Sequence, residues 1–192
     1  MLVLMQVLAG GFYLLQKVFL SIAERAERKN PNNKRWRVYA WSVYLAGLPA
    51  WTVIFVWEHN WIAAALEVSG APAMILGLTI ALRGSGGQKP GWLDRLAAVL
   101  IIAGIAYSLY DFGGITTVNQ LLELGIIAGF LIGTYQLAHE KPSGYLWYLV
   151  MCTFNGALMW VQDYLWLAAQ QVVSLGFIVD AYLAQRRRIR SA

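Results

Sequence analysis

Seven apolar stretches alternate with short polar gaps along the chain. They cover residues 2–23, 38–57, 61–82, 92–110, 118–139, 144–162 and 164–185. A helix of roughly 20 apolar residues crosses the hydrocarbon core of a bilayer, so the pattern predicts seven membrane-spanning helices. Tryptophan and tyrosine stand near several predicted ends, where such rings anchor helices at the membrane surface.

The basic residues follow the alternation of apolar stretches and polar gaps. Fourteen of the fifteen Lys and Arg residues lie in every second gap or in the C-terminal tail, and the gaps between carry Glu58, His59, Asp111 and Asp163. Because short cytoplasmic loops retain Lys and Arg, we predict a bacterial inner-membrane protein with its N-terminus outside, on the periplasmic side, and its C-terminus in the cytoplasm. The exception is Lys17, which lies within the first stretch.

The composition agrees with this interpretation. Of the 192 residues, 59% are hydrophobic and 13% are charged, whereas soluble domains have roughly 45–50% apolar and about 25% charged residues. The excess apolar surface must face lipid, so we predict an all-α integral membrane protein whose main partner is the bilayer. The net charge of +5 is explained by the loop pattern, so we do not expect a nucleic-acid partner.

An internal repeat organises the seven stretches. The third and seventh match at a spacing of 105 residues, and a weaker Gly-Phe match links the first stretch to the fifth. We therefore predict a 3+1+3 arrangement of two parallel three-helix units: a first repeat over 1–83, a linker and central helix over 84–117 (helix 92–110), and a second repeat with a basic tail over 118–192. The matched positions are Val56, Glu58, Trp61, Ala63, Ala64, Val68 and Ser69 against Val161, Asp163, Trp166, Ala168, Ala169, Val173 and Ser174.

The second half, from Glu123 to Arg188, resembles the PnuC-type vitamin transporter family and, more distantly, the three-helix units of SWEET and SemiSWEET proteins. Its layout is also similar to that of the YgjV-like inner-membrane family. The resemblance implies facilitated transport of nicotinamide riboside or another vitamin or nucleoside. The residues that carry it are Glu123, Gly125, Ala128, Gly129, Lys141, Tyr145, Trp147, Asn155, Gln162, Gln170 and Asp180.

Polar side chains inside the predicted spans are costly in a bilayer and point to a site. We expect a group near the outer side to form a polar pocket, in which the carboxylates and amides bond a hydroxylated solute and the indoles stack on its ring. This group comprises Glu67, Glu123, Asn155, Gln170, Trp51 and Trp160.

Two further charges lie deeper. Lys17 and Asp180 each come about four helical turns from the outer side, so they are expected at similar depth. We predict that they form an inner gate or a structural ion pair, and that their pairing closes the cytoplasmic side in one conformational state.

No catalytic or nucleotide-binding motif is present. The sequence has no G-x-x-x-x-G-K-[ST] loop and no H-E-x-x-H pair, and His59 and His139 are predicted on opposite membrane faces. We therefore predict neither an enzyme, nor a cofactor, nor a metal site.

The sequence favours a facilitator that moves a small polar, ring-containing solute by alternating access between the two bundles. The alternative is a non-transporting accessory subunit packed in a larger membrane complex. A transporter should have an open polar cavity near Glu67 and Glu123, whereas an accessory subunit should be packed solid there. The sequence is compatible with a homo-oligomer or with a partner in a membrane complex, and it does not specify a coupling ion.

Overall fold

The computed structural model describes residues 2–57, 59, 61–84, 90–111, 117–161 and 163–190, with side chains for these except 2–6, 9, 61, 62, 108 and 111. This part of the chain contains seven helices and no strand, which confirms the all-α prediction. Each predicted stretch coincides with one helix. The helices are α1 (Leu2–Lys29), α2 (Arg35–Trp57), α3 (Trp61–Arg83), α4 (Gly91–Asp111), α5 (Val118–Ala138), α6 (Ser143–Val161) and α7 (Leu165–Arg190).

Two helices run beyond their apolar stretches. Helix α1 continues from Ala23 to Lys29, and α7 continues from Gln185 to Arg190. The added turns are rich in Glu and Arg, so a search for apolar residues ends too early. Three of their charged side chains form ion pairs described below, which helps to explain why the helices continue: Glu24 and Glu27 are buried and Arg188 is half-buried.

The N-terminus of α5 shows how local sequence sets a boundary. The Thr117 hydroxyl accepts a hydrogen bond from the backbone N–H of Gln120 at 3.2 Å, and the Gln120 side chain accepts one from the Thr117 N–H at 3.1 Å. This reciprocal pair is a capping box, which satisfies two of the free donors at a helix start.

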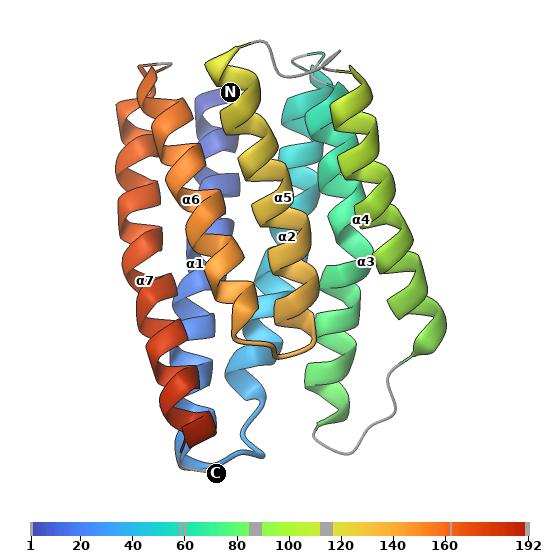
Figure 1. Ribbon diagram of the computed structural model, residues 1–192. Coiled ribbons are helices and arrows are strands. Elements are labelled where there is room, and N and C mark those ends of the chain that lie inside the picture. The colour runs from blue at the N-terminus through green and yellow to red at the C-terminus, as the bar shows by residue number, and fades with distance from the viewer. Residues whose placement is uncertain are drawn as a thin grey trace.

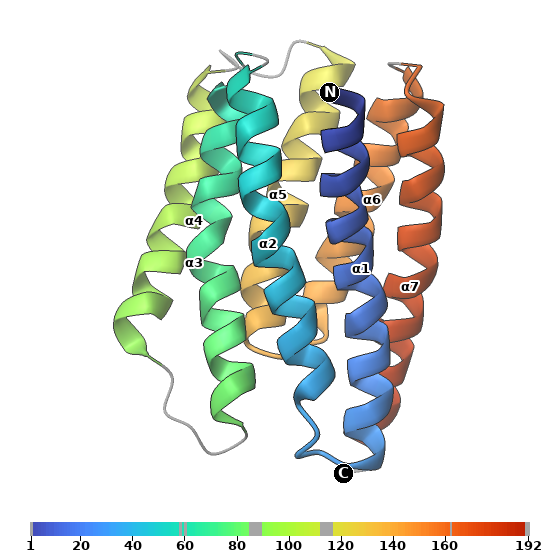
Figure 2. The ribbon, with the colours of Figure 1, turned by 180° about the vertical axis from the view of Figure 1, so that it is seen from behind.

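The helices run up and down in one bundle (Figures 1 and 2). Six helices form a closed ring in the order α1, α2, α3, α5, α6, α7 and back to α1. Helix α4 lies outside this ring and packs against α3 and α5. We refer to the end where α1 finishes and α2 begins as the basic end, and to the other as the opposite end.

Tight packing between helices depends on small residues. A Cβ atom added to Gly129 of α5 would lie 2.7 Å from the backbone nitrogen of Met151 and from the backbone oxygen of Trp147, both in α6. The two backbones can approach so closely only because Gly129 has no side chain.

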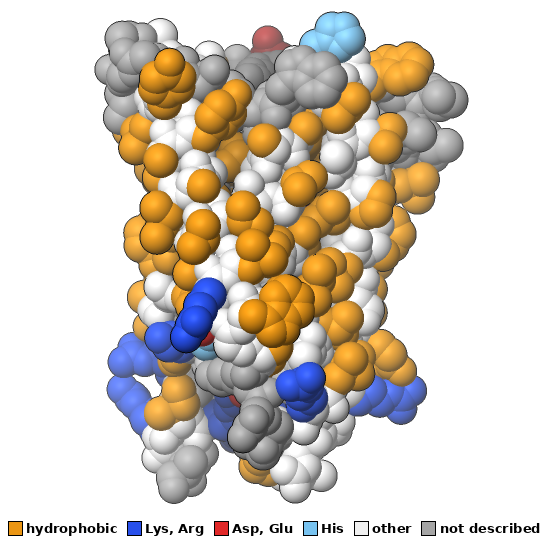
Figure 3. Space-filling view, turned by 90° about the vertical axis from the view of Figure 1, so that its right-hand side faces the viewer, with side chains coloured by type: hydrophobic (Ala, Val, Ile, Leu, Met, Phe, Trp, Pro, Cys, Tyr) orange, Lys and Arg blue, Asp and Glu red, His pale blue; other side chains and the backbone are white. Residues whose placement is uncertain are grey.

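The outside of the bundle is apolar. Figure 3 shows hydrophobic side chains over most of the face on the side of α3 and α4, with Lys and Arg gathered toward the basic end. Within the described residues, α2, 63–83 of α3, α5 and α7 are long and apolar enough to cross a membrane. Together, the four helices and this surface indicate a membrane protein.

Candidate functional site

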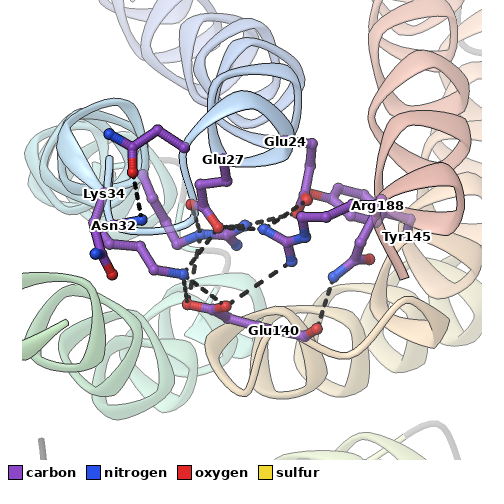
Figure 4. Close-up of polar contacts among 10 residues, drawn as sticks. Glu24, Glu27, Asn32, Lys34, Glu140, Tyr145 and Arg188 are labelled. Atoms are coloured by element: carbon purple, nitrogen blue, oxygen red, sulfur yellow. Dashed lines mark hydrogen bonds and ion pairs between the residues drawn. The ribbon is translucent and has the colours of Figure 1, made fainter. Parts of the chain in front are cut away.

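A cluster of buried ion pairs fills the interior of the ring at the basic end (Figure 4). It joins the end of α1, the start of α2, the α5–α6 loop and the end of α7. Three carboxylates meet three cations there, so their formal charges balance. We call this group the ionic cluster; it consists of Glu24, Glu27, Lys34, Arg37, Glu140 and Arg188.

Arg37 is the centre of the ionic cluster. Its Nε lies 2.7 Å from Glu27 Oε1, and its Nη2 lies 2.7 Å from Glu24 Oε1. Lys34 Nζ lies 2.9 Å from Glu27 Oε2 and 2.7 Å from Glu140 Oε1. Glu24 and Glu27 are fully buried and Arg37 is 1% exposed. A buried charge is stable only when it is paired and hydrogen-bonded in this way.

The second half of the chain completes the ionic cluster. Arg188 of α7 bonds Glu27 and lies 3.3 Å from Glu24 Oε2. The Tyr145 hydroxyl of α6 donates to Glu24 Oε1 at 2.9 Å. Gln185 donates from Nε2 to the backbone oxygen of Glu140 at 2.7 Å. Contacts from α1, α2, α6 and α7 therefore lock the basic end of the bundle.

The sequence allows this geometry because Glu24 and Glu27 are three residues apart, which places both carboxylates on one face of α1. Glu27 lies beyond the apolar stretch 2–23. Burial on its own would raise the pKa of its carboxyl, but the charges of Arg37 and Lys34 outweigh burial and hold that pKa below its ordinary value.

A second polar group lies further inside the ring, between the ionic cluster and the opposite end. Its members come from α1, α2, α3, α5 and α6, hence from both halves of the chain. We call this group the central cluster; it consists of Tyr13, Gln16, Lys17, Tyr44, Glu67, Thr134 and Tyr148.

Hydrogen bonds cross the ring inside the central cluster. The Tyr13 hydroxyl of α1 donates to the Glu67 carboxylate of α3, although these two helices are not neighbours. The hydroxyl of Thr134 lies 3.0 Å from that of Tyr148 and 3.5 Å from that of Tyr44. The interior of the ring is therefore spanned by long polar side chains.

Lys17 points into this group. Its Nζ donates to the backbone oxygen of Tyr13 at 3.1 Å and lies 5.9 Å from the ring centroids of Tyr13 and Tyr148. The residue is 4% exposed. Cation–π attraction to the two rings compensates part of the cost of burying this ammonium.

Several buried polar atoms here have no hydrogen-bond partner. Gln16 is fully buried and lies beside the Tyr148 hydroxyl, yet neither its amide nitrogen nor its amide oxygen bonds a described group with ordinary geometry. The indole nitrogens of Trp41 and Trp51 also have no hydrogen-bond partner among the described residues. An unmade hydrogen bond of this kind costs about 1–3 kcal/mol, and a bound polar solute would remove that cost.

Only some of the residues of the predicted pocket lie close together. Glu67 belongs to the central cluster, and the ring of Trp51 lies 6.0 Å from that of Tyr13, which bonds Glu67. Trp51 therefore lies beside the group that contains Glu67, with Tyr13 between the two residues. The sequence did not predict three members of this group, Tyr13, Gln16 and Tyr148, because nothing in the sequence distinguishes them from ordinary residues of apolar helices.

The other four predicted pocket residues lie apart from this group. Gln170 donates to the backbone oxygen of Gly10 at 2.6 Å and so links α7 to α1. Glu123 and Asn155 are half-buried and form no hydrogen bond or ion pair with the described residues. Trp160 is 67% exposed, so its indole is not enclosed with Glu67.

Lys17 and Asp180 do not form the predicted ion pair. Asp180 accepts hydrogen bonds from Ser21 and Arg25 instead, and these lie one and two turns beyond Lys17 on the same face of α1. Asp180 therefore meets α1 closer to the basic end, while the ammonium of Lys17 turns toward Tyr13. The prediction estimated depth from residue counts, which are too coarse to separate neighbouring turns.

Two surface hollows can be compared with the predicted open cavity near Glu67 and Glu123, and neither corresponds to it. One hollow of about 640 Å³ is lined by Thr52, Val53, Val56, Trp57 and His59. A second, of about 180 Å³, lies between α3 and α4 and is lined by Ala65, Leu66, Ser69, Ala103, Gly104 and Tyr107. Neither is lined by a member of the central cluster.

The ionic cluster was missed because its charges were attributed to topology alone. The signal that points to it is the pairing of Glu24 and Glu27 with basic residues across a short turn. No group of His, Cys, Asp and Glu suited to a metal ion occurs in the described part of the chain.

Comparison of the chain with protein-family models, with curated proteins and with solved structures gave no match.

Proposed function

We propose that the protein is a membrane facilitator for a small polar, ring-containing solute, of the vitamin or nucleoside class, which binds at the central cluster. The observation that carries this proposal is a buried polar group with unpaired hydrogen-bonding atoms, enclosed by a ring of helices from both halves of the chain. Such atoms are costly in a purely structural core, and a solute would satisfy them.

The order of the helices supports two repeats. Exchanging α1, α2 and α3 with α5, α6 and α7 leaves the set of packed neighbours within the ring unchanged. Helix α4 stands outside the ring, as a helix that restores the direction of the second unit should. In this proposal all seven helices cross a bacterial inner membrane, and the two units move relative to each other in alternating access.

Charge supports the orientation. The described Lys and Arg residues other than Lys17 lie at or near the basic end, which is therefore proposed to face the cytoplasm. The ionic cluster then closes the central cluster on the cytoplasmic side. The likeness of 123–188 to PnuC-type transporters agrees with this arrangement and with a ring-containing solute.

Uptake into proteoliposomes tests the proposal. We expect uptake of a nucleoside such as uridine by the wild type, and a loss of about tenfold or more in Glu67→Gln, because a hydrogen bond to a charged group contributes about 1.5–3 kcal/mol. Asp163→Asn is the matched control, since Asp163 is exposed at the opposite end and its φ of 61° suits Asn. Equal uptake by Glu67→Gln and the control would contradict the proposed site.

A non-transporting accessory subunit is the second candidate. It is favoured by one observation, namely that neither described hollow opens onto Glu67. In that case the purified protein would move no solute in the same assay and would be isolated from membranes with a partner in fixed stoichiometry.

A further inference from the structure

The central cluster holds one cation and one anion that are not directly paired. Lys17 and Glu67 are close enough to influence each other electrostatically, yet they form no ion pair. Tyr13 serves both: its backbone oxygen accepts from Lys17, and its hydroxyl donates to Glu67. The formal charge of the central cluster is therefore zero, with its positive and negative groups held apart.

The unused hydrogen-bonding capacity is also divided between two ends. An ammonium has three donors, and Lys17 uses one of them on Tyr13. The amide of Gln16, in the preceding position of α1, adds two further free groups. Glu67 is an acceptor that bonds only the Tyr13 hydroxyl in the described structure. Donors are thus spare beside Lys17, and acceptor sites are spare at Glu67.

Aromatic side chains border the same space. Tyr13 and Tyr148 face Lys17, and the ring of Trp51 lies beside that of Tyr13. The unpaired indole N–H of Trp51 is a further donor. These faces suit a flat ring, which the polar groups would then orient.

We propose that Lys17 and Glu67 make the central cluster selective for a solute of zero net charge, either neutral or zwitterionic. An oxygen of the solute meets Lys17 and Gln16, and an N–H or O–H group of the solute meets Glu67. The reason is that a net charge brought into this enclosed site would have no counter-charge, which is costly in a medium of low dielectric constant. This inference rests on the proposed function and names the solute class for the same site.

Two ribosides provide a matched pair of probes. Nicotinamide riboside carries a pyridinium and is a cation, whereas nicotinic acid riboside carries the same ring with a carboxylate and is a zwitterion at neutral pH. Their affinities for the purified protein in nanodiscs can be measured by calorimetry. We expect the wild type to bind the zwitterion about tenfold more tightly, because like-charge and unpaired-charge penalties are of at least this size.

Charge variants make the test specific. Lys17→Met leaves the site with the charge of Glu67 alone, so the preference should invert toward the cation. Glu67→Gln removes the attraction for the pyridinium, so the preference for the zwitterion should grow. Lys141→Met is the matched control, because Lys141 is exposed in the α5–α6 loop and outside the central cluster. If Lys17→Met elutes as an aggregate in size-exclusion chromatography, the affinity ratio of Glu67→Gln tests the inference on its own.

The outcomes separate the inference from the function beneath it. Tighter binding of the cation by the wild type, or the same affinity ratio in the wild type and in a folded charge variant, overturns the inference and leaves the transporter proposal standing. If neither riboside nor uridine binds or is taken up, the proposed function falls and the inference with it.

Discussion

Two buried polar clusters lie inside one ring of helices, and they are satisfied to very different degrees. In the ionic cluster each charged group is paired, and where single atoms such as Arg37 Nη1 lack a partner, the same residue is bonded through another atom. In the central cluster neither polar atom of Gln16 forms a hydrogen bond of ordinary geometry with a described group, although the Tyr148 hydroxyl lies beside it. A satisfied network holds one structure, whereas unsatisfied buried atoms require a further partner, which in the proposed function is the solute.

Their positions give this difference a meaning. The ionic cluster ties the α1–α2 turn to the α5–α6 loop and to α7, so it joins the two halves at the basic end. The central cluster is also shared by both halves, but its charged groups form no ion pair among the described residues, and the hydrogen bonds of Thr134 are 3.0 and 3.5 Å long. We infer that the ionic cluster stabilises the closed state and that the central cluster provides the site.

The largest expected effect comes from breaking the ionic cluster. Glu27→Gln keeps the shape of the side chain but leaves Lys34, Arg37 and Arg188 with one carboxylate fewer. We expect the free energy of unfolding in detergent to fall by about 3–5 kcal/mol, because unpaired buried charges are costly. Arg28→Gln, on an exposed neighbour, is the control. Equal losses in the two variants would mean that the ionic cluster is not a stabilising lock.

The same carboxyl predicts a dependence on pH. The pKa of Glu27 is lower in the folded protein than in the unfolded chain, so its contribution to stability is complete above the unfolded pKa and is lost as the pH falls through the folded pKa. Thermal unfolding followed along an acid series should show this loss in the wild type. Glu27→Gln should reduce the slope; an unchanged slope would assign the acid sensitivity to other groups.

The central cluster should respond in the opposite sense. Gln16→Leu removes a buried amide that forms no hydrogen bond of ordinary geometry with the described residues, so we expect stability to rise by about 1–3 kcal/mol while solute binding is lost. Gln170→Leu is the matched control, because that amide bonds Gly10 and its loss should destabilise the protein. If Gln16→Leu is destabilised like the control, Gln16 is an ordinary structural residue.

The smallest effect is expected at an exposed indole. Trp160→Ala should change the free energy of unfolding by no more than about 0.5 kcal/mol, and it should leave uptake unchanged, because this side chain is 67% exposed. Trp51→Ala should weaken solute binding, since Trp51 borders the central cluster through Tyr13. Loss of uptake in Trp160→Ala would instead support the larger pocket, including Trp160, that the sequence predicts.

The number of helices follows from apolar length and basic gaps, which are visible in sequence, whereas the charged ends of α1 and α7 do not follow from them. The place of Glu67 in a buried polar cluster could be predicted, because a lone carboxylate in an apolar helix requires a polar partner. The partners of Lys17 and Asp180 could not, because which groups meet across the ring depends on helix rotation. A shift of one residue rotates a side chain by about 100°. Arg37 and Glu24 were hidden because charges near helix ends usually remain solvated.

The central claim is that the ionic cluster closes the central cluster on the basic side, and the protein's single cysteine provides the direct test. Cys152 is fully buried in α6, and it lies close enough to Lys17 for the two side chains to interact electrostatically. Its alkylation by a membrane-impermeant thiol reagent can be timed from either side of sealed vesicles. We predict slow labelling from the basic side in the wild type, much faster labelling from that side in Glu27→Gln, and protection by a bound nucleoside. Labelling from the basic side at the same rate in both proteins, with no protection by solute, would contradict the claim.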